Sequence, residues 1–346
     1  MAEAEKALIS EPTPPSAGMS PPGLTLAQIV QTQIETLREH HGAVLESEAV
    51  EAVHKMRVTT RRLQASLDLL EEEMHAPKLK RRLRKWRRAL SQVRNYDVFL
   101  HLLDEEATGR RRRTHREQFQ LVKSLLQERR VRKAAKVRQF LENIDIDVIA
   151  SSLRLDSVAA EHQDIDATQE TQFDPIQSPP NQIDERKVAA YAAERLDQRL
   201  AEFQALVAQS HPTTDPTELH QLRIAAKRVR YLLEVVRQMG FGDGTRALAW
   251  LRTLQDRIGD WHDLEALEEE IIEITSSRKF LKQHLAESGR ILQAAAHLQK
   301  KKEALVSKLF PVRVPRTLIL TAQRTAKALR REAMRKQTET PAVNNA

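Results

Sequence analysis

Apolar residues recur at helical spacing along most of the chain, and no segment alternates apolar and polar residues as a strand would. This spacing predicts helices over residues 24–46, 49–74, 77–107, 111–143, 185–210, 215–239, 243–274, 277–308 and 315–337. Residues 145–184 interrupt the series, because they are acidic, contain prolines and lack periodicity beyond a short helix expected near 147–160. We therefore expect an all-α protein with two helical halves, residues 24–144 and 185–337, joined by an acidic linker.

The composition supports this fold class. The chain of 346 residues has 40% apolar residues but only 9 glycines and 4% aromatic residues, as is typical of helical bundles. Residues 1–23 and 338–346 are expected to be disordered tails, and no apolar run is long enough to span a bilayer. The sequence thus predicts a soluble cytoplasmic protein with no membrane partner.

One short pattern of histidine and basic residues occurs in both halves. The stretch "HKMRVTTRRLQ" (54–64) is repeated as "HQLRIAAKRVRY" (220–231). The equivalent positions are His54 and His220, Arg57 and Arg223, Arg61 and Lys227, and Arg62 and Arg228. A second stretch, "LSQVRNYDVFLHL" (90–102), resembles "IGDWHDLEALEEE" (258–270). Such a duplication is a stronger signal than either copy alone.

The repeated helix is expected to be apolar on one side and cationic on the other. The histidine and the basic residues at i+3 and i+7 share one stripe, which in the second copy also includes Arg230. No carboxylate stands one turn after the histidine or after its basic residues at i+3 and i+7, and stacked like charges cost a few tenths of a kcal/mol per pair. A basic helix face is commonly just solvated, but the repeat and the missing counter-charges favour a binding surface. The basic stretch 78–90 adds Arg84 and Arg88 as candidates.

No constellation for catalysis stands out. The chain has no cysteine, no glycine-rich phosphate loop and no HExxH motif, so we expect no catalytic residue and no cofactor. The cluster of Asp260, His262 and Asp263 could ligate a divalent metal, but a hydrogen-bond network at a helix boundary explains it equally well. No metal site is predicted.

These stretches resemble the signatures of the CHAD family, the conserved histidine α-helical domain. The resemblance covers about residues 24–335, with Asn95 and Gln64 departing from the usual residues. It implies two four-helix bundles related by a pseudo-twofold axis around a basic central groove or pore. It also implies that the ligand is inorganic polyphosphate. By position, the implied contacts are His54, Arg57, Arg61, Arg62, His220, Arg223, Lys227, Arg228 and Arg230.

The formal net charge of +8 agrees with a polyanionic partner. Polyphosphate carries closely spaced charges and no bases, so a non-catalytic module needs only cations to bind it. Such a module would be targeted to polyphosphate granules. One alternative is a nucleic-acid-binding protein, although the stripes include only Tyr231 for base stacking. A second alternative is a helical scaffold or accessory protein of phosphate metabolism. No protein partner is predicted.

Overall fold

The computed structural model describes residues 23–47, 49–70, 77–108, 116–147, 150, 153, 183–211 and 215–335. Those residues form helices and no strand, which confirms the all-α prediction. The first series is α2 (Leu26–Glu46), α3 (Val50–Leu69), α4 (Pro77–Thr108) and α5 (Arg116–Glu142). The second is α7 (Glu185–Gln209), α8 (Pro216–Gln238), α9 (Thr245–Ser276), α10 (Arg278–Leu309) and α11 (Arg316–Ala333). The two tails, most of the acidic linker and most of its short helix lie outside the described residues.

Local sequence fixes where several of these helices begin. Thr25 and Gln28 form a capping box at the start of α2. The Asp184 and Asp215 carboxylates accept hydrogen bonds from the first free backbone N–H groups of α7 and α8, and Pro216 occupies the first turn of α8. These caps explain why the predicted helix starts agree closely with the observed ones.

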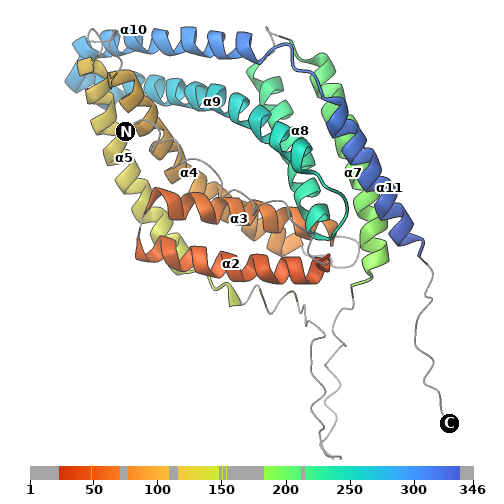
Figure 1. The fold of residues 1–346 in the computed structure, drawn as a ribbon. Helices are drawn as coiled ribbons and strands as arrows, with labels where there is room; N and C mark the ends of the chain where they lie inside the picture. The colour runs from red at the N-terminus through yellow and green to blue at the C-terminus, as the bar shows by residue number, and fades with distance from the viewer. Residues whose placement is uncertain are drawn as a thin grey trace, which may run out of the picture.

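Helix packing repeats between the two series. Contacts of α2 with α3, α3 with α4, and α4 with α5 have counterparts in α7 with α8, α8 with α9, and α9 with α10. Across the repeat, α3 contacts α8 and α4 contacts α9, while α11 lies along α7 (Figure 1). The helices that carry the two basic stripes therefore meet each other.

Two hydrophobic cores hold the described helices together. The larger core combines α2, α3, α7, α8 and α11 with the N-terminal parts of α4 and α9 and the C-terminal part of α5. The smaller core joins the C-terminal parts of α4 and α9 to α10 and the N-terminal part of α5. Both cores draw residues from both halves of the sequence, so the division into two four-helix bundles is not confirmed.

Matching ion pairs tie each long helix to the next one. Asp97 of α4 accepts from Arg130 of α5 at 2.5 Å. At the equivalent place in the repeat, Glu265 of α9 pairs with Lys302 of α10, which also pairs with Glu268. In the internal repeat, α5 is therefore the counterpart of α10, and α4 is the counterpart of α9. Within the described part of the chain, no helix has the length and apolarity needed to cross a membrane.

Candidate anion-binding site

The apolar faces of α3 and α8 are buried as the sequence predicts, and this leaves the basic stripes on the other side of each helix. On α3 the buried residues include Val53, Met56 and Leu63, and on α8 they include Leu222 and Val229. A helix held on one face presents the opposite face to whatever lies beside it. Here each stripe faces the other series of helices.

Six cations from three helices form what we call the central basic cluster. Its members are Arg57 and Arg61 on α3, Arg87 and Arg94 on α4, and Arg223 and Lys227 on α8. After burial, like charges oppose protonation here, and the charge of Arg61 acts to lower the pKa of each of the other five. The predicted stripes are therefore brought together around one residue.

Burial and mutual repulsion disfavour the charged forms of these residues. Burial, followed by the charges of Arg61 and Arg94, lowers the pKa of Arg57 to about 9. Burial and the same Arg61 charge bring the pKa of Lys227 well below its ordinary value. The Nε atoms of Arg57 and Arg223 are buried without a hydrogen-bond partner among the described residues. Positive charge and unsatisfied donors gathered in one place favour an anion.

One face of α9 completes the surroundings of the cluster. The guanidinium group of Arg223 lies so near Gly259 that a β-carbon there would be 3.4 Å from Nη2. The His262 and His220 rings lie 5.3 Å apart between centroids. Burial and the charge of Arg223 lower the pKa of His262 to about 4, while burial and the charges of Arg223 and Lys227 lower the pKa of His220. Both imidazoles therefore take up a proton less readily than an ordinary histidine.

Asp263 is a carboxylate that acts on several members of the cluster. Its charge favours the protonated forms of Arg57, Arg94 and Arg223, which come from three different helices. The equivalent residue in the first half is Asn95, which carries no charge. The cluster thus keeps a large excess of positive charge.

The structure places three other predicted residues beside carboxylates. The Nε atom of Arg62 and that of Arg230 each lie 3.8 Å from a carboxylate oxygen of Glu234, so both form ion pairs with it. Arg228 is exposed and pairs with Glu202 of α7 at 3.0 Å. Arg230 is buried, yet its charge still reaches Lys227. These ion pairs link α8 to α3 and to α7, and contact of the three arginines with a ligand stays a prediction.

The remaining predicted residues lie at its edges. His54 is partly buried on α3, in the stripe of Arg57. Arg84 is exposed, and its charge helps to lower the pKa of Arg87. Arg88 is also exposed and lies about 100° around α4 from Arg87. Whether these residues contact a ligand also stays a prediction.

Sequence reasoning missed Arg87 and Arg94 as site residues. They are seven positions apart on α4, the spacing of one helix face, and this spacing was the available signal. From the basic stretch 78–90, Arg84 and Arg88 were predicted instead. Arg87 and Arg94 meet the other cations only because α4 packs against α3 and α9, which a single sequence does not reveal.

The structure also bears on the metal alternative. Among the described residues, no group of three or more histidine, aspartate or glutamate side chains is placed to hold a metal ion. The Asp260 carboxyl is surrounded by other carboxylates, and burial together with Asp263 and Asp256 raises its pKa to about 6. Its side chain still reaches the surface.

Comparison with known proteins identifies relatives of this arrangement. The profile of the CHAD domain family matches residues 28–271. The crystal structure of the CHAD domain from the plant Ricinus communis is 19% identical, with a TM-score of 0.58 over 88% of this chain and 99% of that one. PptA from Streptomyces chartreusis is 18% identical, with a TM-score of 0.52 over 85% of this chain and 100% of its own. At these identities the likeness concerns the fold. No curated protein matches the chain.

Proposed function

The chain belongs to the CHAD domain family, and on that premise we propose that its central basic cluster binds inorganic polyphosphate without turning it over. The family is generally associated with polyphosphate. The observation that carries the proposal for this chain is the charge of Arg61, which acts on cations from α3, α4 and α8 at once. A linear polyanion is the ligand that relieves repulsion among several cations together.

The chemistry of the cluster favours binding over proton transfer. Guanidinium groups stay charged at neutral pH and donate forked hydrogen bonds to phosphate oxygens. Arg57 and Arg223 each have a buried Nε donor without a partner among the described residues. A phosphate chain alongside them would supply the missing acceptors, and low local hydration would strengthen each bond.

Proteins that bind single-stranded nucleic acid usually add aromatic faces, on which bases stack, to their cations. Tyr231 is the aromatic residue that the sequence places in the second stripe, and it is only 7% exposed. The Arg230 guanidinium lies over its ring at 4.6 Å from the centroid. We therefore propose that nucleic acid binds more weakly than polyphosphate of similar charge.

The proposal is tested by removing four charges in two different places. One variant replaces Arg57, Arg61, Arg223 and Lys227 by alanine. The matched control replaces Arg316, Arg324, Lys327 and Arg331, which are exposed on α11, so both variants lose three arginines and one lysine. We expect the affinity for long-chain polyphosphate at about 0.15 M salt to fall at least about 100-fold in the first variant and at most about threefold in the control.

Equal losses in the two variants would contradict a shaped site, because general attraction depends on net charge alone. The same titrations with single-stranded DNA test the alternative. Binding of DNA that is tighter than binding of polyphosphate at matched charge would replace polyphosphate by nucleic acid as the ligand.

We extend the proposal to location. A module that holds the polymer would gather where the polymer is condensed, so we propose that the protein associates with polyphosphate granules. Fluorescence microscopy of a tagged chain tests this, and the four-residue variant of the cluster should lose any such association.

A further inference from the structure

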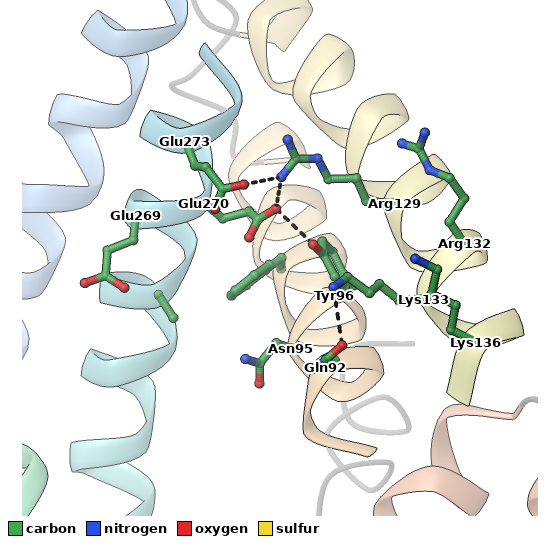
Figure 2. A pocket seen from close by; sticks show the side chains of 12 residues that line it. Gln92, Asn95, Tyr96, Arg129, Arg132, Lys133, Lys136, Glu269, Glu270 and Glu273 are labelled. Atoms are coloured by element: carbon green, nitrogen blue, oxygen red, sulfur yellow. Dashed lines mark hydrogen bonds and ion pairs between the residues drawn. The ribbon is translucent and has the colours of Figure 1, made fainter. Parts of the chain in front are cut away.

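Beside the central basic cluster, α4, α5 and α9 line a cavity of about 590 Å³ (Figure 2). Its α5 wall carries Arg129, Arg132, Lys133 and Lys136, whose spacing puts all four on one face of that helix. We propose that this cavity, the α5 cleft, binds the continuation of a long polyphosphate chain whose first part occupies the cluster. This inference rests on the proposed function and adds a preference for long chains.

The α5 cleft adjoins the cluster on two helices. On α9, Asp263 acts on the cluster, and Ala266, less than one turn further along the same face, lines the cleft. On α4, Arg94 belongs to the cluster, and its neighbour Asn95 lines the cleft. A chain that leaves the cluster along these helices therefore reaches the cleft directly.

A row of residues along α4 leads into the cleft. Gln92, Asn95 and Phe99 line it, and Arg88 lies one turn before Gln92 on the same side of the helix. Arg88 is exposed, and the described residues give it no ion pair. The position of Arg88 outside the central cluster is explained if it contacts the chain near the mouth of the cleft.

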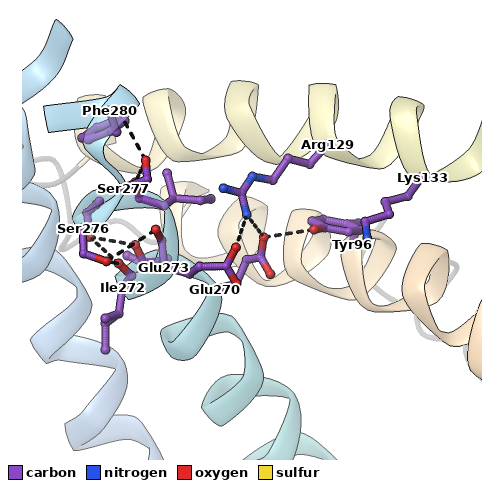
Figure 3. A network of polar contacts seen from close by, with 12 residues as sticks. Tyr96, Arg129, Lys133, Glu270, Ile272, Glu273, Ser276, Ser277 and Phe280 are labelled. Atoms are coloured by element: carbon purple, nitrogen blue, oxygen red, sulfur yellow. Dashed lines mark hydrogen bonds and ion pairs between the residues drawn. The ribbon is translucent and has the colours of Figure 1, made fainter. Parts of the chain in front are cut away.

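The opposite end of the cleft is closed to a polyanion. Arg129 donates to Glu270 at 2.6 Å and to Glu273 at 3.2 Å, so its charge is already matched (Figure 3). The Tyr96 hydroxyl donates to the same Glu270 at 3.0 Å, and burial together with Glu270 raises its pKa to about 12. Because these carboxylates repel phosphate, the bound chain should end before them.

The cations that remain for a ligand lie between these two ends. Lys133 makes only a 3.3 Å hydrogen bond to Gln92, and Arg132 and Lys136 are exposed without an ion pair among the described residues. The α5 segment from Lys136 to Arg132 rises about 6 Å. That length accommodates one or two phosphate units, in addition to those held by the cluster.

The internal repeat shows which of these cations the fold does not require. When α5 is aligned with α10 on their ion pairs to Asp97 and Glu265, Ala304 and Leu305 occupy the positions of Arg132 and Lys133. The same alignment places Lys301 and Lys308 at the positions of Arg129 and Lys136, so the repeat keeps those two charges. Arg132 and Lys133 are therefore the cations that distinguish the α5 side, and they favour this side as the route of the chain away from the cluster.

The test compares ligand lengths in a double variant. Arg132→Ala with Lys136→Ala removes an exposed arginine and an exposed lysine four residues apart. The control, Lys327→Ala with Arg331→Ala, removes the same pair at the same spacing on α11. Affinities for long-chain polyphosphate and for tripolyphosphate are measured by calorimetric titration over a range of salt concentrations.

We expect the cleft variant to bind long chains about tenfold more weakly and tripolyphosphate within about twofold of wild type. Each lost phosphate contact should also reduce the dependence of log affinity on log salt by about one for the long chains. An unchanged long-chain affinity, or equal losses for both ligands, would overturn the inference while leaving the proposed function intact. Failure of the four-residue cluster variant to weaken either ligand would instead overturn the proposed function.

Discussion

Lys227 extends from α8 into a space that it shares with cations of α3. Burial and the charges of Arg61, Arg223 and Arg57 lower its pKa well below the ordinary value. A lysine in such a place costs stability in the ligand-free protein, because both dehydration and like charges disfavour the ammonium form. Under the proposed function, Lys227 contributes to binding at the expense of stability.

The first prediction is that Lys227→Met stabilises the ligand-free protein and weakens polyphosphate binding. Methionine keeps the length of the side chain and removes the charge, so the free energy of unfolding should rise by about 1 kcal/mol. Urea denaturation without ligand measures it, and Lys327→Met on exposed α11 is the control. A variant that is both less stable and unchanged in affinity would show that the ammonium group has another, structural partner.

His262 provides the second prediction, which concerns pH. Its pKa of about 4 lies below the ordinary 6.5, chiefly because of burial and then the charge of Arg223. The unfolded chain therefore binds a proton that the folded, ligand-free protein does not. Stability should fall as pH decreases from about 6.5 towards 4, by up to about 3 kcal/mol from this residue.

Bound phosphate should raise the pKa of His262, since an anion nearby favours the imidazolium. Binding then takes up a proton, and affinity should increase as pH falls below the pKa of the bound state. His262→Gln should reduce both effects, measured by urea denaturation and by titration between about pH 8 and pH 5. If the variant keeps the full pH dependence, the proton taken up on binding goes to His220 or His54 instead.

At the scale of the helices, the ends and the buried faces were the predictable part. The capping residues Thr25, Asp184 and Asp215 mark helix starts through local chemistry, which a single sequence contains. The family resemblance also implied that the two stripes share one ligand, which stays a prediction. The partners of Arg62 and Arg228 were not predictable, because Glu234 and Glu202 approach them only through helix packing.

The third prediction concerns the connection between α9 and α10. Lys302 is buried and lies between the Glu265 and Glu268 carboxylates. Its pKa is raised because the hydrogen bonds to these carboxylates outweigh the effect of burial. Lys302→Met leaves two carboxylates facing each other, so the free energy of unfolding should fall by about 3 kcal/mol.

Thermal or urea denaturation measures this loss, with Lys308→Met, an exposed residue of α10, as the control that changes stability by less than about 0.5 kcal/mol. Polyphosphate affinity of folded Lys302→Met protein should stay near wild type, because the cluster lies elsewhere. A loss confined to affinity would mean that Lys302 contacts the ligand.

At the scale of the whole molecule, charge and packing are separated in space. The cations of the cluster come from α3, α4 and α8, whereas the two cores surround those helices on their apolar faces. The sequence predicted an apolar and a cationic side for the repeated helix, but not that the two halves share their cores. The reason is that a core shared between halves depends on contacts between residues far apart in the chain, such as those of α3 with α8 and α4 with α9.

Cores shared in this way also have a consequence for genetic complementation. Neither half of the sequence holds a complete core, so residues 23–147 or 183–335 produced alone should fail to fold cooperatively. Produced together in one cell, the two fragments should recognise each other through the missing apolar surfaces and restore binding. Co-purification of an untagged fragment with its tagged counterpart measures this reassembly. Success would turn the protein into a split reporter, in which polyphosphate itself favours the joining of the two pieces.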